Sequence, residues 1–104
     1  MRMNRLFAAA ILLSLTVATP SVAATPQEVC PSIGEMAATI MTARQNGVIM
    51  STAMATVPDN VLKDLAIDLV KKAYAVPQYN VDENRARAVT EFRNDTELAC
   101  YTAG

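Results

Sequence analysis

The sequence predicts a small all-α bundle of three to four helices, held by one disulfide and preceded by a cleavable signal peptide. Three observations lead to this prediction. The first residues have the composition of an export signal, apolar residues then recur at three- and four-residue spacing, and two cysteines lie near the ends of that helical part. The chain of 104 residues has room for one small domain.

Residues 1–24 have the three parts of a Sec-type signal peptide. Arg2 and Arg5 precede an apolar stretch from Leu6 to Ala18, and small residues follow it. This stretch is shorter than the roughly 20 residues that a spanning helix needs. We expect cleavage after Ala23 or Ala24, with residues 25–104 forming a single helical domain in the periplasm or outside the cell.

Cys30 and Cys100 are the only cysteines, and an exported chain keeps such thiols paired. Neither belongs to a Cys-x-x-Cys motif, and the chain has no His to activate a thiol. We therefore predict a structural disulfide between them, with an intermolecular bridge as the alternative. Closing a loop of this length contributes about 4 kcal/mol in the chain-entropy treatment.

The first helix is predicted over residues 31–46. Pro31 suits its first position, Arg44 complements the dipole of its last turn, and Gly47 suits a left-handed stop. The apolar residues at helical spacing are Ile33, Met36, Ala37, Ile40 and Met41.

Residues 48–57 carry no charge, and Ser51 is a plausible N-cap for a short helix that ends at Pro58. A segment without a polar face is either a core helix at the centre of the bundle or a surface for a partner or a second copy. Under the second interpretation, the candidate interaction residues are Val48, Ile49, Met50, Met54 and Val57.

The third helix follows a cap at Asp59 or Asn60 and stops near Val76, before Pro77. Its apolar stripe is the most regular in the chain, and Asp68 and Lys72 form an i,i+4 pair on the other side. Tyr74 and Tyr79 flank its end and are expected to cap the core with their hydroxyl groups. The stripe comprises Val61, Leu62, Leu65, Ala66, Leu69, Val70 and Ala73.

The fourth helix is predicted to start in a capping-box-like sequence from Asn80 to Glu83. Phe92 is expected to be the aromatic anchor of the core. Each arginine of this helix has an acid one turn away: Asp82 for Arg85, Glu91 for Arg87 and Glu97 for Arg93. The predicted buried side holds Ala88, Val89, Phe92, Thr96, Ala99 and Cys100.

The composition argues against several classes of function. Removing residues 1–24 takes away two of the nine basic residues and none of the ten acidic ones, which leaves a net charge of −3. Such a domain has no electrostatic footprint for nucleic acid. Without His, the usual nucleophilic constellations cannot be assembled, so we predict neither an enzyme nor a metal or cofactor site.

Several short segments resemble a group of small exported two-cysteine proteins of bacteria and their phages. The segments are Cys30, Ile40-Met41-x-x-Arg44-Gln45-x-Gly47, Met50-Ser51, Ala73-Tyr74-x-x-Pro77, Phe92-x-Asn94-Asp95 and Cys100. The resemblance implies an all-helical fold with one disulfide and supplies no activity. Arg44, Tyr74 and Tyr79 are the candidate polar contacts.

Three hypotheses of function follow from the sequence. The first is a non-catalytic binding or interaction module that contacts a protein partner or forms a homodimer. The second is an acid-stress periplasmic chaperone, in which protonation of the carboxyl groups loosens the bundle. The third is an inhibitor or immunity protein of a periplasmic enzyme.

Overall fold

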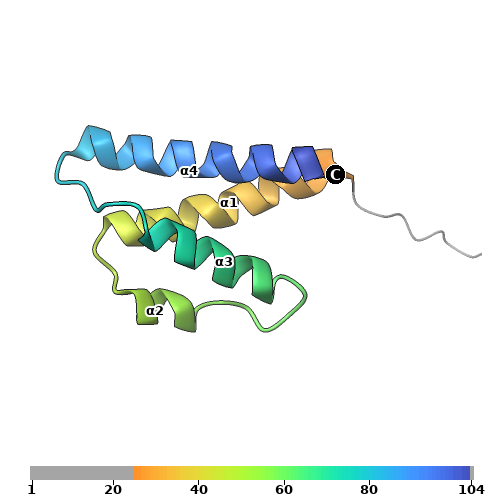
Figure 1. The fold of residues 1–104 in the computed structure, drawn as a ribbon, viewed down its shortest axis with the longest axis horizontal. Helices are drawn as coiled ribbons and strands as arrows, with labels where there is room; N and C mark the ends of the chain where they lie inside the picture. The colour runs from red at the N-terminus through yellow and green to blue at the C-terminus, as the bar shows by residue number, and fades with distance from the viewer. Residues whose placement is uncertain (1–24, 104) are drawn as a thin grey trace, which may run out of the picture.

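The computed structural model describes residues 25–103, so the predicted signal peptide and its cleavage after Ala23 or Ala24 lie outside the described residues. Residues 25–103 form four helices and no strand (Figure 1). A disulfide joins Cys30 to Cys100, whose Cα atoms are 5.6 Å apart. The predicted all-α fold and its disulfide are confirmed. The helices are α1 (Pro26–Gln45), α2 (Met50–Ala55), α3 (Lys63–Tyr74) and α4 (Asp82–Ala103).

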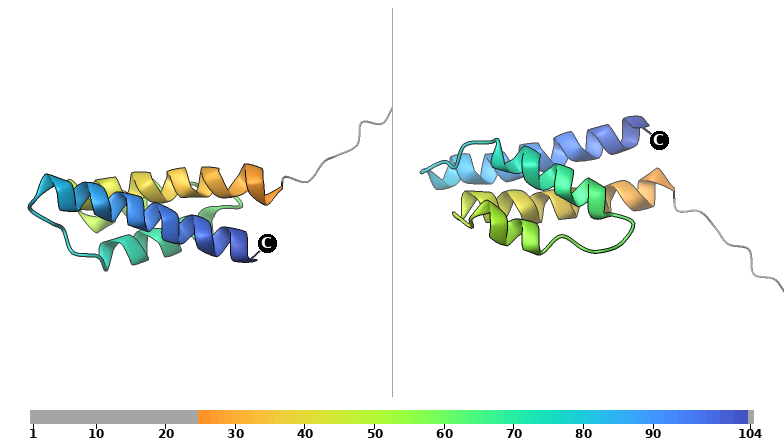
Figure 2. Two further views of the ribbon diagram at one scale, coloured as in Figure 1. Left: turned by 90° about the horizontal axis from the view of Figure 1, so that it is seen from above. Right: turned by 60° about the horizontal axis from the view of Figure 1, so that its bottom comes forward.

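Helix α1 is the central element, because α2, α3 and α4 all contact it (Figures 1 and 2). The disulfide places the beginning of α1 beside the end of α4, so these two helices run antiparallel. Arg44, in the last turn of α1, hydrogen-bonds to Val76, just after α3, so α1 and α3 run in the same direction. Helix α2 and its loops return the chain to the start of α3 and pack against it.

Helix α1 begins five residues earlier than the sequence analysis predicted, and Pro31 lies inside it. The start is fixed by Thr25, whose backbone N–H donates to the Glu28 carboxylate at 3.2 Å, and by Pro26 in the first helical position. Pro31 leaves the Gln27 carbonyl without its helical donor, and the helix continues because flanking residues pack on α4. Gly47 adopts a φ of 83° after the helix, as expected for a left-handed stop.

The predicted starts of α2 and α3 are also wrong by a few residues. Ile49 and not Ser51 precedes α2, and α2 ends at Ala55 before Pro58 is reached. Asn60 accepts a hydrogen bond from the Leu62 N–H at 2.8 Å and so caps a turn that precedes α3 rather than α3 itself. Val61 consequently lies outside the helix and is 95% exposed, although the sequence analysis placed it in the core stripe.

The centre of the core lies toward the end of α1. Met41, Ala73 and Ala88, one from each of α1, α3 and α4, form a buried cluster, and partly buried apolar side chains surround it. Phe92 is one of these, so it packs on the core as predicted but keeps one side open. The other surrounding residues are Ile40, Tyr74, Val76, Tyr79 and Val89.

Toward the disulfide, α1 and α4 approach closely at Gly34. A methyl group on Gly34 would collide with the Glu97 side chain, which lies over it. Glu97 accepts a hydrogen bond from Arg93 at 2.7 Å, and Arg93 also reaches Glu35 of α1 at 3.2 Å. The disulfide, this ion-pair network and the glycine therefore hold the second half of α4 on α1.

Candidate functional site

The uncharged segment 48–57 lies at the edge of the molecule and not at its centre. Its helix α2 buries only Ala53, while Ile49 is 66% and Met50 39% exposed. Val48, Met54 and Val57 are half-buried. The core-helix interpretation is therefore wrong, because α2 packs on the outside of α3 instead of between the longer helices. Ile49 and Met50 remain candidates for a contact surface.

The predicted polar contact residues Arg44 and Tyr74 are used within the fold. Arg44 donates from Nε to the Val76 carbonyl at 2.9 Å, and its guanidinium lies 5.3 Å from the centre of the Tyr74 ring. The Tyr74 hydroxyl donates to the Val48 carbonyl at 2.6 Å. These contacts fasten the loops before α2 and after α3 to the end of α1.

Gln45 is the residue of this region that the sequence analysis did not single out. It is 2% exposed, its amide nitrogen donates to the Pro77 carbonyl at 2.8 Å, and its amide oxygen accepts from the Tyr79 N–H at 2.9 Å. The signal was present in the sequence as the Arg44-Gln45 and Tyr74-x-x-Pro77 segments, which the fold brings into contact. We call these contacts of Gln45 with residues 77–79 the Gln45 latch.

Helices α3 and α4 both pack on α1 (Figure 2). Side chains of these three helices line an open apolar groove between α3 and α4. Its volume is about 740 Å³. Ile33 of α1 lies at its inner side, and Cys100 contributes to its α4 wall. We call it the α3/α4 groove; its other lining residues are Leu65, Asp68, Leu69, Lys72, Val76, Phe92, Asp95, Thr96, Ala99 and Ala103.

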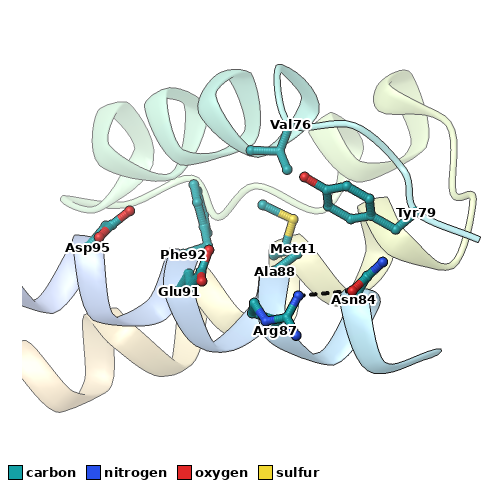
Figure 3. A pocket seen from close by; sticks show the side chains of 9 residues that line it. All are labelled: Met41, Val76, Tyr79, Asn84, Arg87, Ala88, Glu91, Phe92 and Asp95. Carbon is teal, nitrogen blue, oxygen red and sulfur yellow. Dashed lines mark hydrogen bonds between the residues drawn. The ribbon is translucent and has the colours of Figure 1, made fainter. Parts of the chain in front are cut away.

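A smaller cavity of about 400 Å³ adjoins the groove near the beginning of α4 (Figure 3). The two share Val76, Phe92 and Asp95 in their linings, so together they follow α4 along most of its length. Met41 and Tyr79 lie on the side of this cavity opposite the α4 residues Asn84, Arg87 and Glu91. Tyr79 is thus the one predicted polar contact residue whose side chain lines a cavity.

The charges along the groove divide into paired and unpaired groups. Lys72, on the α3 side, lies 2.8 Å from Asp68. Arg87 donates to Asn84 at 2.9 Å and lies 3.9 Å from Glu83, so the predicted pair with Glu91 is not formed. Within residues 25–103, Glu91 and Asp95 have no ion-pair partner. The α4 wall of the groove therefore carries one uncompensated carboxylate, Asp95, and the adjoining cavity carries a second, Glu91, one helical turn earlier.

The walls of the groove are held rigidly on the α4 side. Hydrogen bonds donated to Glu97, and then to Glu35, raise the pKa of Arg93 above its ordinary value. Arg93 therefore stays charged, and its ion pairs with Glu97 and Glu35 connect α4 to α1 beside the groove. The Thr96 hydroxyl donates to the Phe92 carbonyl at 2.8 Å, so this groove residue is already hydrogen-bonded within α4.

Comparison of the chain with known protein families, with curated proteins and with solved structures found no match. Among residues 25–103, no cluster of three or more His, Cys, Asp and Glu side chains has the arrangement of a metal site. No helix in this part of the chain combines the length and apolar character needed to cross a membrane. The α3/α4 groove is the candidate functional site, because it is an open apolar surface lined by residues of three helices.

Proposed function

We propose that the chain is an exported, non-catalytic binding module whose α3/α4 groove receives apolar side chains of a protein partner. The observation that carries the proposal is the open groove itself. Leu65, Phe92 and Ala99 line a concave surface that the domain leaves uncovered. Concave apolar surfaces with a few polar groups at the edge are typical of binding sites.

The contacts that hold the helices around the groove in place favour binding, because a rigid site loses less conformational entropy when it is occupied. Helix α4 is fixed to α1 by the disulfide between Cys30 and Cys100 and by the Arg93 network. At the other end, the Gln45 latch fixes the loop that leads into α4. The walls therefore keep their positions without an occupant.

The side chains at the groove favour binding over catalysis. Its polar groups are the ion-paired Asp68 and Lys72, the hydrogen-bonded Thr96 and the carboxylate of Asp95. These groups contain no nucleophile with an adjacent base. Export to the periplasm or the medium belongs to the proposal, and the intramolecular disulfide is compatible with such an oxidising compartment.

A fluorescence titration tests this function, because the chain contains no Trp and a peptide with one Trp reports binding by itself. The probe is an amphipathic helical peptide with Leu and one Trp on its apolar face and Gln on its polar face. We expect saturable binding to residues 25–104 in the oxidised form. The Ala99→Phe variant fills the groove and is expected to lower the affinity at least tenfold.

The matched control is Asn94→Phe, which adds the same ring on an exposed position of α4 that lines neither cavity. We expect it to bind like the parent. The ring added at position 99 contacts apolar walls, so thermal stability is expected to stay unchanged or rise while binding is lost. Equal affinity of the two variants for the peptide would contradict the proposal. Loss of peptide binding in a variant substituted only at Ile49 and Met50 would contradict it as well.

A further inference from the structure

We infer that the partner presents a basic amphipathic helix of about three turns, with its cationic residues along the α4 edge of the groove. This inference rests on the proposed function and specifies the occupant of the same site. Three properties of the groove carry it: the kind of element that forms its walls, the length of the shorter wall and the distribution of unpaired charge.

The walls favour a helical occupant. Both are α-helices, whose backbone N–H and C=O groups are hydrogen-bonded within the helix, so the groove offers no strand edge to an extended peptide. An extended occupant would lose hydration of its backbone on burial without gaining protein hydrogen bonds. A helical occupant keeps its internal backbone hydrogen bonds when it is buried, so it does not pay this cost.

The length of the groove sets the length of that helix. Helix α3 has 12 residues, which corresponds to about 18 Å. Its groove residues run from Leu65 to Lys72, and Val76 follows the helix. A partner helix of about three turns fits this span and would place apolar side chains at i, i+3 or i+4, and i+7 in the groove.

The distribution of charge around the groove indicates the charge of the partner. On the α3 edge, the charge of Lys72 is balanced by Asp68 at 2.8 Å. Asp95, in the α4 wall of the groove, and Glu91, one turn earlier in the adjoining cavity, form no ion pair with another described residue. Lys or Arg side chains on that side of an incoming helix would be attracted, whereas the anionic headgroup of a fatty acid would be repelled. A basic helix is therefore favoured over an anionic lipid.

The experiment compares three peptides that differ only in the polar face: the Gln peptide above, and versions with Lys or Glu in place of Gln. We expect affinity to fall in the order Lys, Gln, Glu, with the Lys peptide about threefold to tenfold tighter than the Gln peptide at low salt. Added salt is expected to remove most of that difference.

The variant that removes the charge is the double substitution Glu91→Gln and Asp95→Asn. It is expected to bind the Lys and Gln peptides equally. The control is Asp59→Asn with Asp64→Asn, which changes the net charge by the same amount at exposed positions outside the groove and is expected to keep the preference for Lys.

The outcomes separate this inference from the proposed function. Equal binding of the three peptides, lost in Ala99→Phe, would overturn the basic partner and leave the groove as a binding site. Failure of all three peptides to bind, or full binding by Ala99→Phe, would overturn both. Preferential binding of palmitate would assign the groove to an acyl chain, and a homodimer that Ala99→Phe dissociates would assign it to a second copy; both results would overturn the inference.

Discussion

The two ends of the α1–α4 pair are held together in different ways. Toward the end of α1, side chains hold the elements together: Met41, Ala73 and Ala88 meet in a buried cluster beside the smaller cavity, and Gln45 anchors the loop after α3. Toward the disulfide, α4 is fixed on α1 by a covalent bond and ion pairs, and its side toward α3 stays open.

The difference follows from the size of the side chains on α4. In its first half, Val89 and Phe92 are long enough to reach the core shared with α3. In its second half, most of the side chains that line the groove are small, among them Thr96, Ala99 and Ala103, and they do not fill the space toward Leu65. The disulfide joins this half of α4 to α1 although the space toward α3 is not filled.

The largest effect on stability is expected from removing the disulfide, at the end of the domain where the α3/α4 groove is open. Replacing both cysteines by Ser is expected to lower the free energy of unfolding by about 4 kcal/mol, because the unfolded chain regains the entropy of the closed loop. Urea unfolding followed by circular dichroism measures this change. A loss below about 1 kcal/mol would show that packing, and not the bridge, holds the second half of α4.

The next largest effect on stability is expected from a substitution in the buried cluster near the end of α1. Met41→Ala is expected to cost about 3 kcal/mol, since the side chain is fully buried in the cluster and its removal leaves a cavity. Met50→Ala is the matched control, because Met50 is 39% exposed on α2 and should cost less than about 1 kcal/mol. Similar losses in both variants would contradict the position of the core.

A smaller loss of stability is expected from removing the Gln45 latch, which holds the loop after α3 on the end of α1. Gln45→Leu leaves the Tyr79 N–H and the Pro77 carbonyl without their partners and is expected to cost about 2 kcal/mol. Gln27→Leu changes the same residue type at an exposed position of α1 and serves as the control. Hydrogen exchange at Tyr79 should become faster in Gln45→Leu only; unchanged exchange there would contradict the latch.

The smallest effect is expected from Arg93→Gln, which removes partly exposed ion pairs. Because the pKa of Arg93 is raised, its charged form contributes at every pH below the raised value and the contribution would be lost only at more alkaline pH. The stability difference from the parent should therefore be constant between about pH 6 and 10. Thermal unfolding across this range checks it, and a difference that varies between pH 6 and 10 would contradict the assignment.

The sequence predicted those features that depend on local periodicity or on a single possible pairing. The α3 stripe from Leu65 to Ala73 is buried at Ala66, Leu69, Val70 and Ala73, and the disulfide forms as the only intramolecular pairing. The Asp68–Lys72, Asp82–Arg85 and Glu97–Arg93 pairs also form, because each needs only helical spacing.

The helix starts were wrong where a second signal competed with the one chosen. Pro31 predicts a helix start after Cys30, but the capping box from Thr25 to Glu28 starts the helix earlier. Asn60 caps the turn at residues 61–62 that directly precedes α3, and no local pattern distinguishes such a turn from the first turn of a helix.

The groove itself could not be predicted, because periodicity shows which face of α4 is apolar and not whether a neighbour covers it. Ala99 was expected to be buried on that face and is exposed. The lack of charge in segment 48–57 predicts either a core helix or a contact surface, whereas the groove combines residues from α1, α3 and α4 that are distant in the sequence.

The most direct test of the binding groove is a heteronuclear NMR titration of labelled, oxidised residues 25–104 with the Lys peptide. We predict that the largest chemical-shift changes fall on Leu65, Leu69, Thr96, Ala99 and Ala103, and that Ile49, Met50 and Met54 do not shift. Shifts confined to α2, or spread evenly over the domain, would contradict the assignment of the site to the α3/α4 groove.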